Sequence, residues 1–167
     1  MSSIPFPHIS DMIQKHGDLF DKHFSDDMDD QTAVLKAHLL VEGLIRDFCF
    51  QSVRNPSYLR DLRLNFHQVV QLARSFMVFE SPAFDKYWGM VNTLNQLRNL
   101  MAHELEPDQA RFEKCRKALI AAAAQEQATL NQSLAFLCGA MNSLLPVALE
   151  LHRKMSRRYD EADPADR

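Results

Sequence analysis

Glycine and cysteine are both scarce in this sequence. Four glycines in 167 residues are too few for the many tight turns of an all-β fold. The three cysteines, Cys49, Cys115 and Cys138, lie far apart and form no C-x-x-C pair. This pattern indicates reduced thiols in a cytoplasmic protein and argues against a disulfide framework or a zinc site.

Motifs for cofactors are missing as well. The sequence contains no H-E-x-x-H helix, no P-loop and no glycine-rich dinucleotide turn. Four of the seven histidines show no ligand spacing with one another: His8, His16, His23 and His67. We therefore expect neither a metal ion nor a nucleotide cofactor.

No excess of positive charge marks the chain as a nucleic-acid binder. Lysine and arginine number 19 against 22 aspartates and glutamates, which gives a formal charge of −3. Any contact with RNA must therefore use a local basic patch. Residues 1–7 lack the basic start and apolar run of a signal peptide. The uncharged stretch 127–149 contains too many amide side chains for a membrane span, so no membrane association is expected.

The helical periodicity of apolar residues predicts an all-α fold, an up-and-down bundle of about five or six helices. With 46% apolar residues, the chain suits a single domain over 1–167, with a core at about 9–159 and a frayed tail at 160–167. The expected helices span Ile9–Phe24, Gln31–Val53, Asn65–Phe79, Ser81–Glu106, Asp108–Gln125 and Gln127–Tyr159, with a short turn or helix at Tyr58–Leu64. The last two helices are either continuous or bent near Thr129, and Pro146 should kink the final one.

Two of these helices have a pattern that bears on the site. The helix at 31–53 has one apolar face around Val41 and a second at Leu35, Leu39 and Phe50, which predicts burial in the bundle or between subunits. The helix at 81–106 is expected to point Trp88, with the apolar residues in its frame, into the core. The opposite side of that helix carries a stripe of amides and a histidine: Asn92, Asn95, Gln96, Asn99 and His103.

The string Arg98-Asn99-Leu100-Met101-Ala102-His103 combines a permanent cation with a group that titrates near pH 7. Such a pair is sufficient to cleave RNA without a metal, because the base can deprotonate a 2′-hydroxyl and the cation can stabilise the charged phosphorus. Five residues along a helix correspond to about 140° of rotation, so Arg98 and His103 do not share a face. The arginine must therefore reach round the helix or meet the histidine of a second copy. Alternatively, both are ordinary residues of a helix end.

The segment Leu94–His103, with its string LRNLMAH, resembles the signature of the HEPN superfamily (higher eukaryotes and prokaryotes nucleotide-binding). That signature is arginine, a polar residue, three variable residues and histidine. The segment Leu35–Ile45 also resembles the central helix of bacterial members, and the whole resemblance spans roughly 33–106. It implies a helical homodimer and, in many members, a metal-independent ribonuclease that is often the toxin of a toxin–antitoxin pair. Other members have lost catalysis and act as binding or regulatory modules.

The resemblance also implies roles for individual residues. His103 would be the general base or acid, Arg98 would stabilise the phosphorane-like charge, and Asn99 would orient the histidine or the phosphate. Two motifs would face each other across a two-fold axis, and the product would carry a 2′,3′-cyclic phosphate. One known variant has a tyrosine two residues after the histidine, where an antitoxin modifies it. Leu105 occupies that position here, so this form of regulation is not expected.

Further residues permit two interpretations each. His38, Glu42 and Arg46 are four residues apart and form either a border ion pair or a support in which Glu42 pairs with Arg98 or orients His103, with Asn95 assisting. Four arginines are either a solvated surface or a phosphate-binding rim for RNA: Arg54, Arg60, Arg63 and Arg74. The chain as a whole is thus either a ribonuclease or a non-catalytic module that binds a protein partner or acts in transcription regulation.

Overall fold

A computed structural model describes residues 8–78, 81–103, 108–123 and 127–162 of the chain. Over these residues it contains seven helices and no strand, which confirms the all-α prediction. The helices are α1 (Ile9–His23), α2 (Asp30–Ser52), α3 (Pro56–Asp61), α4 (Phe66–Ser75), α5 (Pro82–His103), α6 (Gln109–Ala123) and α7 (Leu130–Ala162). The predicted helix at 65–79 is wrong at its end, because α4 ends at Ser75 and residues 76–78 are described but not helical. The predicted helical ends at 104–106 and Gln125 lie outside the described residues.

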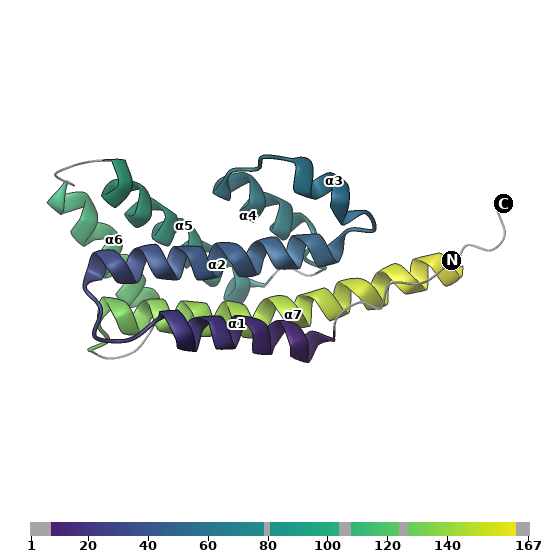
Figure 1. Cartoon of the computed structure of the whole chain (residues 1–167), viewed down its shortest axis with the longest axis horizontal. Coiled ribbons are helices and arrows are strands. Elements are labelled where there is room, and N and C mark those ends of the chain that lie inside the picture. The colour runs from purple at the N-terminus through teal and green to yellow at the C-terminus, as the bar shows by residue number, and fades with distance from the viewer. Residues whose placement is uncertain (1–7, 79–80, 104–107, 124–126, 163–167) are drawn as a thin grey trace.

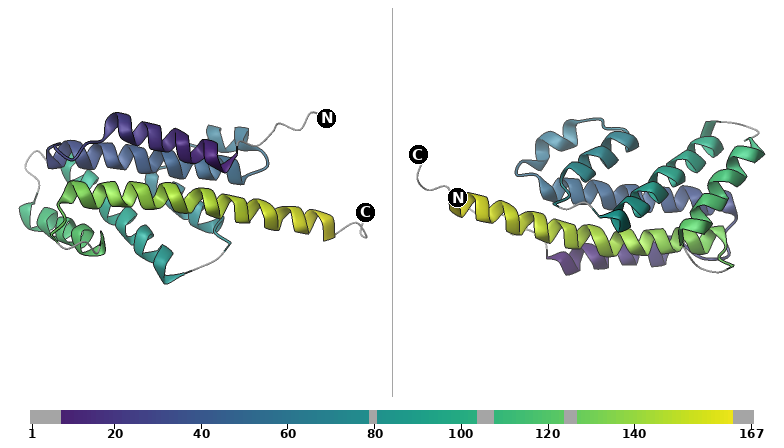
Figure 2. Two further views of the ribbon diagram at one scale, coloured as in Figure 1. Left: turned by 90° about the horizontal axis from the view of Figure 1, so that it is seen from below. Right: turned by 180° about the vertical axis from the view of Figure 1, so that it is seen from behind.

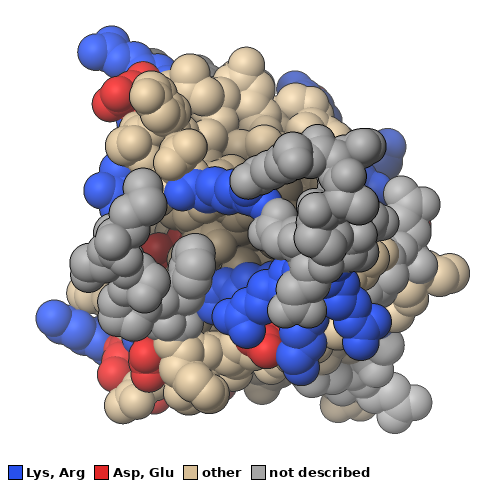
Figure 3. Space-filling model, turned by 90° about the vertical axis from the view of Figure 1, so that its right-hand side faces the viewer, with Lys and Arg blue, Asp and Glu red and all other residues tan. Residues whose placement is uncertain are grey.

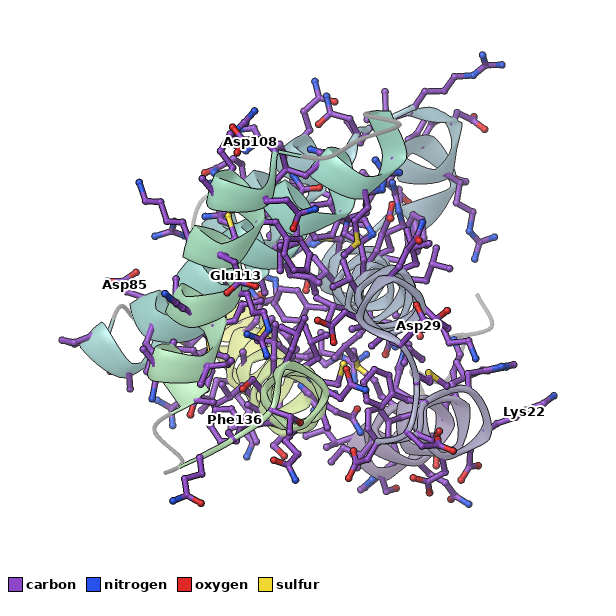
Figure 4. The ribbon with its side chains drawn as sticks, turned by 90° about the vertical axis from the view of Figure 1, so that its left-hand side faces the viewer. Lys22, Asp29, Asp85, Asp108, Glu113 and Phe136 are labelled. Carbon is purple, nitrogen blue, oxygen red and sulfur yellow. The ribbon has the colours of Figure 1, made fainter. Side chains whose placement is uncertain are left out.

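Helix α7 is the axis of the bundle. It lies along α2 and α1 on one side and contacts α5 and α6 on the other, as the two views of Figure 2 show. Figure 1 shows α3 and α4 over the C-terminal half of α2, while the end of α5 and the start of α6 lie at the opposite end of the molecule. Figure 4 looks along α2 and α7, with α1 (marked by Lys22) and α6 (marked by Glu113) on different sides of them.

The helix boundaries follow from local chemistry in the sequence. Asp29 caps α2 by accepting a hydrogen bond from the Thr32 backbone N–H at 2.9 Å. Ser81 stands just before α5, and Pro82 occupies its first turn, as predicted. The predicted last helix divides from its predecessor because Thr129 and Gln132 exchange side-chain-to-backbone hydrogen bonds before the first turn of α7.

Helix α7 differs from its prediction in two details. It begins at Leu130 where Gln127 was expected, and it extends to Ala162 where Tyr159 was expected. Pro146 lies inside its 33 residues, and the kink expected there stays a prediction. The segment Leu130–Arg158 is long and apolar enough to cross a membrane by length and composition. A core helix passes the same test, and α7 packs against four other helices.

The core confirms the predicted faces of α2 and α5 with one exception. Val41 and its frame are buried, and so is Trp88, which is 4% exposed. On α5 the buried face is wider than predicted and includes Met90 and Leu100. On the second apolar face of α2, Leu35 and Leu39 are 37% and 67% exposed, whereas Phe50 is half-buried beside Arg60. The predicted burial inside the bundle is therefore wrong for the two leucines, and their burial between subunits stays a prediction.

Candidate functional site

The motif Arg98–His103 forms the last turns of α5. Arg98 is half-buried, and its Nη1 donates a hydrogen bond to Asn99 Oδ1 at 2.9 Å. Asn99 precedes His103 by four residues, so the two share a face of the helix. The hydrogen bond therefore directs the guanidinium of Arg98 toward the face of α5 that carries Asn99 and His103. The His103 side chain lies outside the described side chains.

This interaction addresses the 140° separation in a way that the sequence did not predict. Asn99 accepts a hydrogen bond from the arginine, and its expected role in orienting the histidine or the phosphate stays a prediction. Among the side chains that the structure describes, no carboxylate lies within ion-pair distance of Arg98. A half-buried guanidinium is well suited to bind an anion.

A buried histidine of α2 holds α5 in place through Asn95, which lies one turn before the motif. His38 is 2% exposed, and its Nε2 lies 3.2 Å from Asn95 Oδ1. Since the amide oxygen only accepts, the hydrogen bond assigns the ring proton to Nε2. The ring also packs on Phe66 with 4.3 Å between centroids. Two of the predicted supporting residues, His38 and Asn95, are thus in contact.

The third predicted support, Glu42, serves a different partner. Its Oε1 accepts from Arg46 Nη2 at 2.7 Å, and Arg46 also donates to the Leu64 carbonyl. Glu42 Oε2 lies 3.6 Å from His38 Nδ1, beyond hydrogen-bond distance. The border ion pair is therefore the arrangement found, and Glu42 pairs with Arg46 and not with Arg98.

Burial lowers the pKa of His38 below its ordinary value of 6.5. The hydrogen bond with Asn95 and the charge of Glu42 oppose this shift, while the positive charge of Arg98 adds to it. His38 is consequently neutral at pH 7. Since it is buried, it positions α5 and does not itself meet a substrate.

The amide stripe of α5 divides between two neighbouring helices. Asn95 faces α2, whereas Gln96 Oε1 accepts from the Cys115 thiol of α6 at 3.6 Å. Gln96 and Asn99 line an open groove of about 630 Å³ between α5 and α6, together with Arg111 and Lys114 of α6. Sequence reasoning missed these two cations. The available signal was Pro107, because a proline in the sequence predicts the end of one helix and room for the next to turn back along it.

The four arginines predicted as an RNA rim do not lie beside the motif. Arg60 lies over the Phe50 ring at 5.8 Å, and Phe50 is about 18 Å along α2 from His38 at 1.5 Å per residue. Arg74 forms an ion pair with Asp85 at 3.1 Å. Arg54 and Arg63 are exposed near the end of α2 and after α3.

The C-terminal part of α7 brings further cationic residues to the end of α2. His152 Nε2 lies 3.0 Å from the Ser52 carbonyl, and Arg153 donates to Gln51 Oε1 at 2.9 Å. Figure 3 shows lysine and arginine side chains gathered on this end of the molecule. Cations of the described residues thus lie both in the α5–α6 groove and at the far end of α2.

Thiol chemistry has little support. Burial raises the pKa of both Cys49 and Cys138 to about 12, so neither is a thiolate at neutral pH. Within the described part of the chain, no three histidine, cysteine, aspartate or glutamate side chains are grouped as they would be around a metal ion.

No family model, curated protein or solved structure matches this chain. The HEPN resemblance therefore rests on the residues of the two segments alone.

Proposed function

We propose that this chain is a metal-independent endoribonuclease of the HEPN type, that it acts as a homodimer, and that it is the toxin of a toxin–antitoxin pair. The observation that supports it most is the Arg98 guanidinium, which Asn99 holds on the His103 side of α5 with no described carboxylate partner. A pre-positioned cation beside a group that titrates near neutral pH is the minimum equipment for this cleavage.

The reaction uses the RNA itself as the nucleophile. His103 removes the proton of a 2′-hydroxyl, and that oxygen attacks the adjacent phosphorus. The bond to the 5′-oxygen of the next nucleotide breaks, and a protonated histidine returns a proton to that oxygen. Arg98 stabilises the negative charge that develops on the phosphoryl oxygens. The products are a 2′,3′-cyclic phosphate and a free 5′-hydroxyl.

The α5–α6 groove is the proposed path for the RNA strand. Arg111 and Lys114 supply positive charge for phosphates, and Gln96 and Asn99 supply amides for bases or sugars. The groove leads to the motif, since Asn99 belongs to both.

The second copy would meet the outward face of α2. Leu35 and Leu39 are the exposed apolar residues of that face, and they flank His38, which senses the Arg98 charge. Covering these leucines would bring two motifs near the same two-fold axis. In this arrangement the histidine of one copy and the arginine of the other belong to the same site.

The deciding experiment incubates purified protein with total RNA in EDTA. Arg98→Ala and His103→Ala should each lower cleavage by roughly 10²-fold or more, without a change in melting temperature. Activity should also fall below about pH 6, where a histidine base becomes protonated. Arg116→Ala is the matched control, because Arg116 lies on α6 with Asp30 and Glu113 as its neighbours. Equal inertness of wild type and both variants would refute the proposal.

A non-catalytic module that binds a protein partner is the second candidate. The observation in its favour is a line of exposed apolar residues four apart on α7, at Val147, Leu151 and Met155. An antitoxin or a component of the transcription machinery would cover this line. In that case RNA would stay intact, and Met155→Glu would abolish complex formation while Arg98→Ala would not.

A further inference from the structure

The polar side chains of the α5–α6 groove have a shared chemical property beside the motif. Two of them, Arg111 and Lys114, are exposed cations of α6, and such side chains only donate hydrogen bonds. The groove has a volume of about 630 Å³, which is typical of pockets that hold a small molecule. It therefore has room for one nucleobase with its ribose.

The two amides that line the groove also present donors. Gln96 Oε1 accepts from the Cys115 thiol at 3.6 Å, and Asn99 Oδ1 accepts from Arg98 Nη1 at 2.9 Å. Each oxygen thus has a partner already, and these partners set the orientation of the two amides. An amide nitrogen only donates. Gln96, which is exposed, and Asn99 therefore offer N–H groups to a ligand in the groove.

The other polar side chain of α5 in the groove lies further from the motif. Thr93 precedes Gln96 by three residues, and its hydroxyl donates to the Gly89 carbonyl of its own helix at 3.0 Å. Its oxygen is left as an acceptor. The part of the groove nearest the motif is consequently rich in donors.

Neighbouring donors distinguish bases by the acceptors that each base presents. One edge of guanine carries two adjacent acceptors, O6 and N7. The same edge of adenine combines an acceptor with a donating amino group, and that of cytosine carries a donating amino group. Uracil has a single acceptor, O4, on this edge. Guanine is therefore the base that two donors can bind without leaving a donor unmatched.

We propose that the α5–α6 groove selects guanine beside the cleaved linkage. Gln96 Nε2 and Asn99 Nδ2, which are three residues apart and so neighbours on the helix, would donate to O6 and N7. Arg111 and Lys114 would hold the flanking phosphates. Because Asn99 also contacts Arg98, the bound base would lie next to the motif. The position of the cut rests on the proposed ribonuclease, whereas the preference in binding does not.

The test measures binding separately from cleavage. Fluorescein-labelled cytidine pentaribonucleotides with guanine, adenine, uracil or cytosine at the centre are titrated with the His103→Ala protein, and anisotropy gives the Kd. The guanine pentamer should bind about ten-fold more tightly than the other three. Replacing guanine by 7-deazaguanine, which lacks the N7 acceptor, should weaken binding roughly five-fold. Equal affinities would show that the donors meet phosphates alone and would overturn the inference, as would absence of binding.

Substitutions then test the donors themselves, again in the His103→Ala protein. Gln96→Met removes the amide from an exposed position and should abolish most of the preference without changing the melting temperature. Cys115→Ala releases Gln96 Oε1, so the amide can offer an acceptor with a donor, and the adenine pentamer should gain affinity relative to guanine. Gln71→Met is the matched control, at an exposed glutamine of α4, and should keep the full preference. A preference that survives Gln96→Met would contradict the assignment.

Mapping the cuts in total RNA separates this inference from the proposed function. The wild-type protein should cut at linkages next to guanine. Guanine-selective binding without any cleavage would support the groove assignment and refute the ribonuclease. Cleavage with no preference for guanine would support the ribonuclease and overturn the groove assignment.

Discussion

At the scale of single residues, the site depends on how Arg98 and His38 influence each other across two helices. Arg98 is held by Asn99 on α5, and its charge helps to keep the buried His38 of α2 neutral. His38 in turn fixes α5 through Asn95. The motif arginine and its support are therefore electrostatically coupled, and this coupling can be measured without any activity.

Removing the cation should change the titration of the histidine. In Arg98→Ala the pKa of His38 should rise, since the positive charge that lowers it is absent. NMR titration of the imidazole signals measures the shift directly. Arg116→Ala, which removes an arginine from a different surface, should leave that pKa as it is; an unchanged pKa in Arg98→Ala would show that the guanidinium lies elsewhere.

His38 should also make stability depend on pH. Its pKa in the folded chain lies below the ordinary 6.5, so the unfolded chain takes up a proton first as the pH falls. The free energy of unfolding should therefore decrease as pH is lowered through about 6.5 and below. Denaturant titrations of His38→Gln should show a smaller decrease than those of wild type. His23→Gln, at an exposed position of α1, should retain the wild-type slope; identical slopes for His38→Gln and wild type would contradict this account.

At the scale of elements, α5 combines a buried face that stabilises the bundle with a polar face that carries the motif. Trp88, Val91 and Leu94 are at most 4% exposed. The amides of the same helix divide between α2 and the α5–α6 groove. A loss of packing on the first face should therefore reduce stability without removing the chemistry from the second.

Truncation of the buried tryptophan tests this separation. Trp88→Ala should lower the free energy of unfolding by roughly 3–5 kcal/mol, because it removes a large side chain from a close-packed core. Chemical denaturation measures the change. Tyr58→Ala is the control: Tyr58 is an aromatic residue that is 76% exposed, so its truncation should cost about 0.5 kcal/mol or less. Equal effects of the two substitutions would show that the helix frame is wrong.

At the scale of the whole molecule, exposed apolar residues lie at helical spacing in two places on the described helices. One is the apolar pair Leu35 and Leu39 on α2, and the other is the apolar line on α7. Exposed apolar residues at regular helical spacing are typical of surfaces that meet another protein. The proposed homodimer uses the first of these surfaces.

The proposed homodimer can be tested by its mass. Light scattering of the wild-type protein should give twice the chain mass of 19.2 kDa. Leu39→Glu should convert the dimer to a monomer and abolish RNA cleavage, because a buried charge without a partner opposes association. Leu62→Glu is the control. Leu62 directly follows α3 and is 55% exposed, so this substitution should leave the mass unchanged. A monomeric wild type at tens of micromolar would exclude the proposed assembly.

Much of the fold was predictable because helices depend on local signals. Apolar periodicity, the cap at Asp29, and Pro82 in the first turn of α5 all act within a few residues of one another. The burial of Trp88 was predictable for the same reason. The division between α6 and α7 was harder, because the exchange between Thr129 and Gln132 competes with a continuous helix of similar composition.

The site was predictable only in part. The sequence singled out His38, Asn95 and Arg98, but it left Glu42 with two possible partners. The structure decides for Arg46, which donates both to Glu42 and to the Leu64 carbonyl just before α4. Likewise, Arg111 and Lys114 become part of the groove only because α6 folds back along α5. Such pairings depend on contacts between residues far apart in the chain, which periodicity does not encode.

The sequence alone determined the helices, their buried faces and the residues of the motif, since each follows from the chemistry of neighbouring positions. Tertiary structure decided what each face meets. It joined His38 to Asn95 across 57 residues and His152 to Ser52 across 100, left Leu39 exposed, and placed the Cys115 thiol against Gln96. The physical reason is that an apolar or polar stripe specifies a preference for burial or water, while the partner that satisfies it is set by how all the helices pack together.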